Sequence, residues 1–391
     1  MKKPNGGKWP GALVLIAALL VPGCAGTGDR PGRGPLRAAA EASAGAGQAE
    51  PPETGGAQGP AARAGLIWPG PEQPGRTGRF VLIPEEPRLG EPLTLAVIPG
   101  PVTERLRAAE LLDAQRRRLC RAAFFPLPVE AAGDAPLLAA ILTVPSTARP
   151  GPAFIRLEGI PGPLNEISLS IGGRDFVSEI IELDQTLTDI RTAPDPRKIA
   201  ESQHLWAILS RTGGEIYGTG VFTPPVASTR RTSFFGDRRI FKYANGKQDS
   251  SIHAGVDYGI PTGTPVSACG PGKVVLARNR IVTGNSVVLE HLPGVYSIYY
   301  HLDSITVSEG DMAAAGTLLG KSGATGLATG PHLHWEIRVS GENTDPDACL
   351  TRPLLDKTAI FAKLNELAEN QPGFGTSSNK GSSENFSFQK Q

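Results

Sequence analysis

Residues 323–336 read Gly-Ala-Thr-Gly-Leu-Ala-Thr-Gly-Pro-His-Leu-His-Trp-Glu, a glycine-rich segment that leads into two histidines one residue apart. On a β-strand, residues i and i+2 project to the same face, about 7 Å apart. His332 and His334 would therefore face one groove, where one can bind a metal while the other faces the same solvent. Short β-type runs separated by glycine turns extend from residue 216 to 350, and they predict a mainly antiparallel β domain.

A second spacing, His253-Ala254-Gly255-Val256-Asp257, separates a histidine from an aspartate by three residues. A helix would bring both side chains to one face, but Gly255, Gly259 and Pro261 disfavour a helix here. On a straight strand the two side chains would share a face yet lie about 13 Å apart, too far to bind one metal. A joint site therefore requires a strand–loop corner, and Gly255 permits the bend.

Histidine is rare in this chain, which gives the two spacings weight. Five of the six histidines lie between positions 253 and 334, and one of them, His301, follows Tyr299-Tyr300 and precedes Leu302. Either spacing alone occurs by chance, whereas the cluster indicates a site. Two imidazoles and one carboxylate suit Zn²⁺ and leave a fourth position open for water, which is typical of a catalytic zinc site.

In their order along the chain, these motifs resemble those of the lysostaphin/LytM-type zinc metallopeptidases, which cleave peptide bonds in bacterial peptidoglycan. The family pattern is H-x-x-x-D, then a tyrosine-flanked H-L, then G-x-T-G and T-G-P-H-x-H. The chain matches it at His253/Asp257, at His301-Leu302, and at Gly323–Gly326 with Thr329–His334. It departs at Thr344-Asp345-Pro346, where the family usually has Asn-Pro, but this lies outside the expected zinc positions.

The resemblance implies a role for each matched residue. His253, Asp257 and His334 would bind zinc, and His301 and His332 would be catalytic histidines near the bound water. Zinc lowers the pKa of its water from about 15.7 toward about 7. One of the two imidazoles would accept the proton and pass it to the leaving amine. The sequence leaves open which of them is the base.

Three neighbouring residues have weaker expectations. Glu336 lies two residues after His334 on the same strand face, and we expect a solvated carboxylate there rather than a partner of the site. His291 precedes the turn Leu292-Pro293-Gly294 and is expected at the surface. Tyr299 either flanks the groove, where it would contact substrate, or packs in the core.

The N-terminus predicts export. Three lysines precede an apolar run, Ala12–Val21, whose ten residues would span only half of a bilayer core of ~30 Å as a helix. Such a run is typical of a secretory signal. It ends in Val21-Pro22-Gly23-Cys24, which resembles the lipobox of bacterial lipoproteins and implies a lipid anchor on Cys24, facing the periplasm or cell wall. The alternative is ordinary cleavage near Ala25 with loss of Cys24.

The composition changes along the chain and suggests several segments. An accessory β-sandwich, which resembles the one found before some such peptidase domains, would be joined to the peptidase by a helix. The ambiguous stretch 104–123 is either a helix or a hairpin. The full division is a signal peptide (1–24), a disordered tether (25–76), the accessory sandwich (77–190), the helical connector (191–215), the peptidase domain (216–350), a C-terminal helix (351–370) and a disordered tail (371–391).

Charge and cysteine content limit the classes of function. The 39 Lys+Arg residues nearly balance the 38 Asp+Glu residues, which argues against nucleic acid as a partner. Apart from Cys24, the chain has three cysteines, Cys120, Cys269 and Cys349, an odd number without paired spacing. We therefore expect three small core residues rather than disulfides or a thiolate zinc site.

The sequence predicts an exported zinc endopeptidase that acts on peptidoglycan cross-links. The alternative is a non-enzymatic envelope protein of the same fold that binds peptidoglycan or activates another hydrolase. Such relatives typically lack zinc ligands, which this chain retains. A carrier barrel that holds a biotinyl or lipoyl group is a third reading, but Lys273 and Lys321 lack the hairpin setting that a carrier lysine needs.

Overall fold

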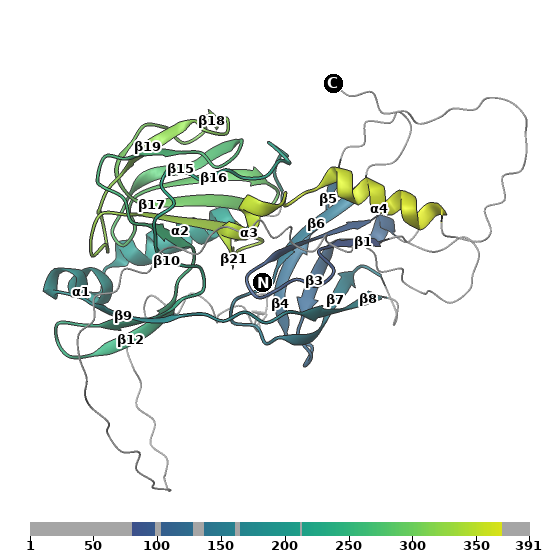
Figure 1. The fold of residues 1–391 in the computed structure, drawn as a ribbon, viewed down its shortest axis with the longest axis horizontal. Helices are drawn as coiled ribbons and strands as arrows, with labels where there is room; N and C mark the ends of the chain where they lie inside the picture. Colours follow the sequence, from purple (N-terminus) through teal and green to yellow (C-terminus); the bar gives the residue numbers. More distant parts are fainter. Residues whose placement is uncertain (1–79, 98–102, 128–136, 161–164, 212, 370–391) are drawn as a thin grey trace, which may run out of the picture.

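The computed structural model describes residues 80–97, 103–127, 137–160, 165–211 and 213–369. The predicted signal peptide, tether and C-terminal tail lie outside these residues. Within them the protein is mainly β, as predicted, with two β-rich parts side by side and few helices (Figure 1). No helix of the described ranges is long and apolar enough to cross a membrane.

The N-terminal part, residues 80–171, consists of two four-stranded antiparallel sheets. The first has the order β1-β2-β6-β5: Phe80–Ile83, Pro92–Val97, Leu137–Thr143 and Phe125–Leu127. The second has the order β4-β3-β7-β8: Arg118–Ala123, Ala108–Leu112, Gly151–Glu158 and Glu166–Ile171. Alternate residues of both sheets, such as Leu95 and Ile155, enter one apolar core. The sheets therefore pack face to face.

The ambiguous stretch 104–123 forms a hairpin. A single 3₁₀ turn, Thr103–Arg105, precedes β3, and β3 pairs with β4. The Asp113 carboxylate closes the turn by accepting from the backbone N–H groups of Gln115 and Arg117. Burial of one strand face in the sandwich core outweighs the helical composition of this segment.

The C-terminal part is built on a ten-stranded antiparallel sheet. Its main path is β10-β13-β20-β17-β16-β15-β18: Arg231–Ser233, Val256–Tyr258, Leu333–Val339, Val295–Ile305, Gly284–Leu292, Gly272–Arg280 and Met312–Ala313. Three further strands pair beside this path: β14 (Pro265–Ser267), β19 (Leu318–Ser322) and β21 (Glu342–Thr344). The predicted turn at Pro293-Gly294 joins β16 to β17, with Gly294 at a φ of 75°.

A small third sheet links the two parts and was not predicted. It has the order β12-β11-β9, with strands Gln248–Ile252, Arg238–Lys242 and Ser178–Glu182. β11 pairs with β12 in antiparallel fashion but with β9 in parallel fashion. The parallel partner lies far back along the chain, so no local pattern reveals this pairing.

Four helices complete the described chain. The predicted connector is α2, Pro196–Leu209, which Asp195 caps by accepting from the N–H of Arg197. α1, Gln185–Thr192, and α3, Pro346–Thr351, were not predicted. The expected C-terminal helix (351–370) corresponds to α4, Lys357–Glu369, which starts later because the Asp356 carboxylate accepts from the Ala359 N–H at its first turn.

The two parts share an apolar core. Ile141 of β6 belongs to the same buried cluster as Val256 and Trp335 of the large sheet. Polar contacts supplement this shared core. Arg174 forms an ion pair with Asp345, and Arg238 donates to the carbonyl oxygen of Ser146 at 2.8 Å. The prediction for the cysteines is confirmed, since Cys120, Cys269 and Cys349 are buried and free.

Candidate metal centre

Strand register brings the predicted ligands together. In the β13–β20 ladder Asp257 lies directly opposite His334, and in the β17–β20 ladder Tyr300 lies opposite the same histidine. His253 lies in the corner between β12 and β13, as its spacing from Asp257 requires. A Cβ atom at Gly255 would lie 2.1 Å from the carbonyl oxygen of Trp335, so glycine is needed for close strand approach.

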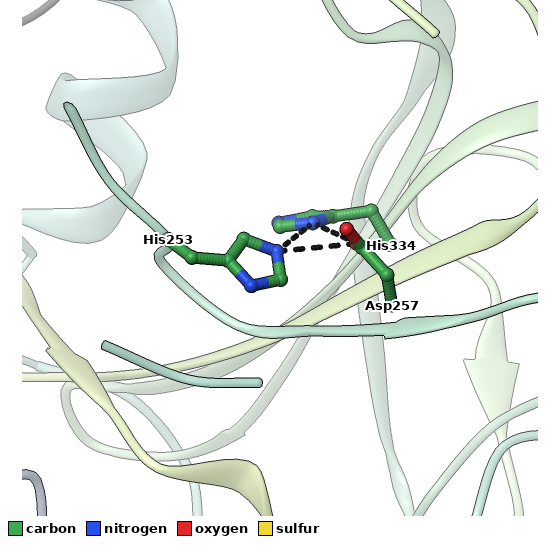
Figure 2. Close-up of side chains that lie close together, drawn as sticks. All are labelled: His253, Asp257 and His334. Carbon is green, nitrogen blue, oxygen red and sulfur yellow. Dashed lines mark hydrogen bonds and ion pairs between the residues drawn. The ribbon is translucent and has the colours of Figure 1, made fainter. Parts of the chain in front are cut away.

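The three side chains meet at one point (Figure 2). Asp257 Oδ1 lies 3.1 Å from His253 Nε2 and 2.7 Å from His334 Nδ1. The two ring nitrogens lie 2.9 Å apart. All three potential ligand atoms fall within 4.8 Å of one another, and all three residues are buried. The group has the composition and spacing of a metal site.

The hydrogen bonds that His253 and His334 make through their other ring nitrogens show whether a cation fits between the two rings. His253 Nδ1 donates to the carbonyl oxygen of Phe234 at 2.8 Å, and His334 Nε2 donates to Glu336 Oε1 at 2.9 Å. In the neutral imidazoles, the nitrogens that face each other then both present lone pairs. Such a pair is stable only with a proton or a cation between them. The donor set therefore fits a divalent cation.

The electrostatics of the centre favour a positive charge. Burial alone would lower the pKa of His334, but the carboxylates of Asp257 and Glu336 outweigh it and raise that pKa to about 9. Burial would raise the pKa of Asp257, yet the two histidines hold it well below its usual value. Burial lowers the pKa of His253. The carboxylates around His334 thus favour a positive charge at this point, as a bound cation would supply.

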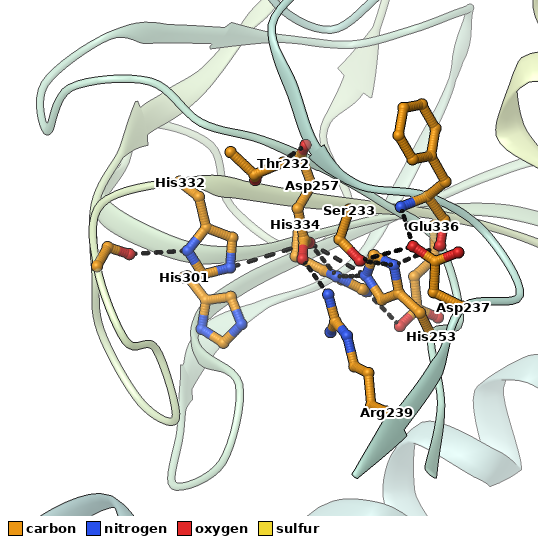
Figure 3. Close-up of polar contacts among 12 residues, drawn as sticks. Thr232, Ser233, Asp237, Arg239, His253, Asp257, His301, His332, His334 and Glu336 are labelled. Atoms are coloured by element: carbon orange, nitrogen blue, oxygen red, sulfur yellow. Dashed lines mark hydrogen bonds and ion pairs between the residues drawn. The ribbon is translucent and has the colours of Figure 1, made fainter. Parts of the chain in front are cut away.

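His301 and His332 lie next to this group, with ring centroids 4.7 Å apart (Figure 3). His301 Nδ1 donates to the carbonyl oxygen of Thr325 at 2.7 Å, and His332 Nδ1 donates to that of Gly330 at 2.8 Å. Each Nε2 is left as an acceptor, and that of His332 lies 3.9 Å from Asp257 Oδ1. Burial lowers the pKa of both rings, that of His301 to about 3, so both are neutral and able to accept a proton.

The backbone of His301 is strained. Its φ of 60° is in the left-handed region, which non-glycine residues rarely adopt. The His301 N–H donates to the carbonyl oxygen of Thr283 at 2.9 Å and holds this conformation. Strain of this kind often accompanies functional positions, where the surrounding structure fixes the side chain.

The expectation for Glu336 is wrong. Its side chain is buried rather than solvated, because β20 is covered on both faces. Oε1 accepts from His334, and Oε2 accepts from Arg338 Nε at 2.7 Å. Glu336 is therefore a direct partner of a candidate ligand. The shared strand face of residues 334 and 336 was the signal for this, and only burial was missing from the sequence.

Arg239 contacts the candidate ligand Asp257, a role that the sequence did not predict. Its Nη2 donates to Asp257 Oδ2 at 2.5 Å (Figure 3), and its Nε donates to Glu179 Oε1 of β9. Ser233 also donates to Glu179 and lies 3.2 Å from His253 Nδ1. Residues of the segment 233–239 therefore contact His253 and Asp257 through the atoms that face away from the other candidate ligands.

The other two expectations are settled by burial. The prediction that His291 lies at the surface is wrong, since its ring is fully buried between the carbonyl oxygen of Pro271 and the hydroxyl of Ser297. Tyr299 packs in the core, where its hydroxyl accepts from the Cys269 N–H at 2.9 Å. Neither side chain faces the metal centre.

Comparison with known proteins finds a family match for part of this region. Residues 251–346 match the family described as peptidase family M23. The DD-carboxypeptidase/endopeptidase Mpg of Neisseria meningitidis serogroup B is 38% identical over 116 residues, covering 29% of this chain and 27% of Mpg. The peptidoglycan DD-endopeptidase ShyA of Vibrio cholerae is 45% identical over 118 residues, covering 30% of this chain and 27% of ShyA.

Lysostaphin of Staphylococcus staphylolyticus is also similar, with 36% identity over 134 residues that cover 34% of this chain and 28% of lysostaphin. The match therefore spans only 27% to 28% of the length of these three relatives. The similarity falls on the segment that carries all five histidine and aspartate positions of the centre.

Proposed function

We propose that residues 251–346 form a domain of peptidase family M23, homologous to the lysostaphin-type enzymes that the motifs resemble, and that the chain is a zinc-dependent endopeptidase acting on peptide cross-links of bacterial peptidoglycan. The observation that carries this proposal is the convergence of five side chains, two catalytic candidates and three ligand candidates, in one cluster, of which all but the partly exposed His332 are buried. The names of the relatives, which include a peptidoglycan DD-endopeptidase, support the substrate class.

We assign the zinc to His253 Nε2, Asp257 Oδ1 and His334 Nδ1, within the proposed peptidase domain of residues 216–350. Imidazole and carboxylate ligands suit zinc, and three protein ligands leave one position open. Zinc at such a site supplies Lewis acidity, which acidifies water and polarises a carbonyl oxygen.

His301 and His332 would handle the proton. Each presents an unprotonated Nε2 toward the centre while its Nδ1 is held by a backbone carbonyl. One ring accepts the proton of the attacking water and then donates it to the leaving amine. Until it passes this proton on, the ring that holds it would help the zinc to stabilise the developing oxyanion, and the other ring would stay neutral.

The competing proposal is a non-catalytic envelope protein that binds peptidoglycan or activates another hydrolase. Retention of every proposed ligand and both neutral histidines argues against it, because a binding role needs neither. The two functions predict opposite results with sacculi: the enzyme releases muropeptides, and the binding protein only sediments with them.

Single substitutions in the full chain test the assigned roles. His253→Ala should abolish both zinc binding and hydrolysis, because it removes a ligand. His301→Ala should keep zinc but lose activity by a factor of about 10² to 10⁴, the usual contribution of a general base. Zinc content is measured by atomic emission, and products by mass spectrometry of released muropeptides.

Treatment with a chelator, followed by added zinc, is the control for metal dependence. Full hydrolysis by His301→Ala would overturn its role. Sacculi that bind wild-type zinc protein but release no muropeptide would favour the non-catalytic alternative. The masses of the released fragments would also identify the bond that is cut.

We further propose that the protein is exported and anchored by a lipid on Cys24. The support is the short apolar run Ala12–Val21 and the lipobox-like residues that follow it. Labelling with a fatty-acid analogue in a bacterial host separates this from ordinary cleavage, since only the lipoprotein loses its label in Cys24→Ser.

A further inference from the structure

The four imidazoles of the centre are not all held in the same way. Three of them donate to main-chain carbonyl oxygens: His253 to Phe234, His301 to Thr325 and His332 to Gly330. His334 alone donates to a carboxylate, that of Glu336; the Ser233 hydroxyl also lies near His253 Nδ1, at 3.2 Å, but the Phe234 carbonyl oxygen is closer, at 2.8 Å. The orientation of this one candidate ligand therefore depends on the identity of another residue.

Glu336 is itself fixed on both oxygens. Oε1 accepts from His334 Nε2 at 2.9 Å, and Oε2 accepts from Arg338 Nε at 2.7 Å. The residue is 3% exposed, so water does not compete for either oxygen. On the other side, the ring of Tyr300 stacks on His334 with an interplanar angle of 8°. The imidazole is thus held in its plane by Tyr300 and at its edge by Glu336.

We propose that Glu336 is a positioning residue of the metal centre, which keeps His334 in the tautomer that presents a lone pair on Nδ1. A carboxylate only accepts, so Nε2 must carry the proton of the neutral ring. Nδ1 then faces His253 and Asp257 as a ligand. The inference rests on the proposed function, and it adds a residue to the site rather than a second activity.

Replacing Glu336 with glutamine would change which groups donate and accept hydrogen bonds here. Arg338 and His334 each need an acceptor, whereas an amide offers one acceptor and one donor. The guanidinium cannot become an acceptor, so the amide oxygen faces Arg338 and the amide N–H faces His334. The ring then gains a hydrogen bond only by moving its proton to Nδ1, where it blocks the cation.

The test is the zinc dissociation constant of the full chain, measured by competition with a chromogenic chelator. Glu336→Gln should bind zinc about 10- to 100-fold more weakly, as is usual when a partner of a metal ligand is lost. The matched control is Glu290→Gln. Glu290 is a buried strand carboxylate that accepts from the Tyr296 hydroxyl at 3.3 Å without contacting the centre, and its replacement should change the constant less than about twofold.

A double variant separates positioning from a general structural role. In Glu336→Gln/Arg338→Met the amide oxygen is free to turn to His334, so zinc affinity should recover by at least about tenfold relative to Glu336→Gln. Loss of a second polar residue, the partly buried Arg338, would not restore zinc affinity if Glu336 only supported the fold. Unfolding midpoints in chelator report the stability of each variant. If Glu336→Gln does not fold, Glu336→Asp breaks the same bond while keeping the charge, and it carries the same expectation.

Zinc binding by Glu336→Gln within about twofold of wild type would overturn the inference, as would a double variant that binds no more tightly than the single one. The measurement needs no hydrolysis. Wild-type protein that binds zinc but cleaves nothing would therefore refute the proposed function and leave the role of Glu336 standing. Wild-type protein that binds no zinc would refute both.

Discussion

Burial lowers the pKa of several histidines in the described part of the molecule, although nearby carboxylates outweigh it at His334. His291 shows the effect away from the metal centre, because its neighbours are a carbonyl oxygen and a hydroxyl rather than charges. Burial lowers its pKa to about 4, with only the hydrogen bond to Pro271 opposing the shift. In the unfolded chain the same ring has a pKa of about 6.5. The unfolded state therefore binds a proton more readily at mildly acidic pH.

This difference predicts acid sensitivity. The folded-state pKa is depressed, so the stability contribution is complete above pH 6.5 and is lost as the pH falls toward about 4. Between pH 7 and pH 4.5 the loss from His291 should be about 2.5 kcal/mol. In His291→Asn the fall in unfolding free energy over this range should be smaller by that amount. Urea unfolding in chelator measures it, and equal falls in both proteins would contradict the assignment.

The sequence was informative for residues whose chemistry is rare and less so for those whose role depends on burial. His253, Asp257 and His334 stood out because histidine is scarce and the spacings match a known pattern. Glu336 and His291 were misjudged because a carboxylate on a strand and a histidine before a turn are usually solvated. Their burial comes from strands that are distant along the chain.

Among the elements, the pairing of β13 with β20 holds two of the candidate metal ligands together. Asp257 and His334 are opposite each other in this ladder, and Gly255 allows the chain to approach the carbonyl oxygen of Trp335. The sequence predicted the bend at Gly255 but not this approach. A backbone carbonyl cannot rotate away from an added methyl group, so the two strands would have to separate.

Gly255→Ala should therefore weaken zinc binding at least about tenfold and destabilise the fold by about 1–3 kcal/mol, as overpacking does. The matched control is Gly220→Ala, because a Cβ atom there meets nothing within 4 Å. Chelator competition and urea unfolding measure the two effects. Zinc binding as tight in Gly255→Ala as in the control would show that the ladder tolerates the methyl group.

The small sheet marks the limit of prediction for elements. Most strands of the N-terminal part were visible as short β-type runs, and α2 as a segment of helical periodicity. The parallel pairing of β9 with β11 has no local signal, since its partners are joined through two helices. This pairing places Glu179 against Arg239, so a structural detail of the centre depends on a long-range contact.

Over the whole molecule, the two β-rich parts behave as one packed body. Ile141 of the first sheet shares a core with Trp335 of the second part, and Ser340 donates to the Ile141 carbonyl oxygen at 2.8 Å. The sequence predicted two β-rich segments and a connector but not this shared core, because sheet faces that pack on each other leave no periodic pattern of their own.

A shared core predicts a single unfolding transition for the zinc-free full chain. Zinc at about 100 times its dissociation constant should then stabilise the whole protein by about 2.7 kcal/mol and move that transition upward. Scanning calorimetry with chelator and with zinc measures the shift, and His253→Ala should show none. Two transitions, of which zinc moves only one, would mean that the parts unfold separately.

The three buried cysteines make the molecule its own reporter. Cys120 lies in the sandwich core, whereas Cys269 and Cys349 lie in the core that both parts share. Burial raises the pKa of each thiol, to about 12 for Cys120 and about 11 for Cys269. Thiolates, which alkylating reagents attack, are thus scarce while the interior is closed. The alkylation rate of each of these cysteines would therefore report how often the core around it opens, and no cysteine would have to be introduced.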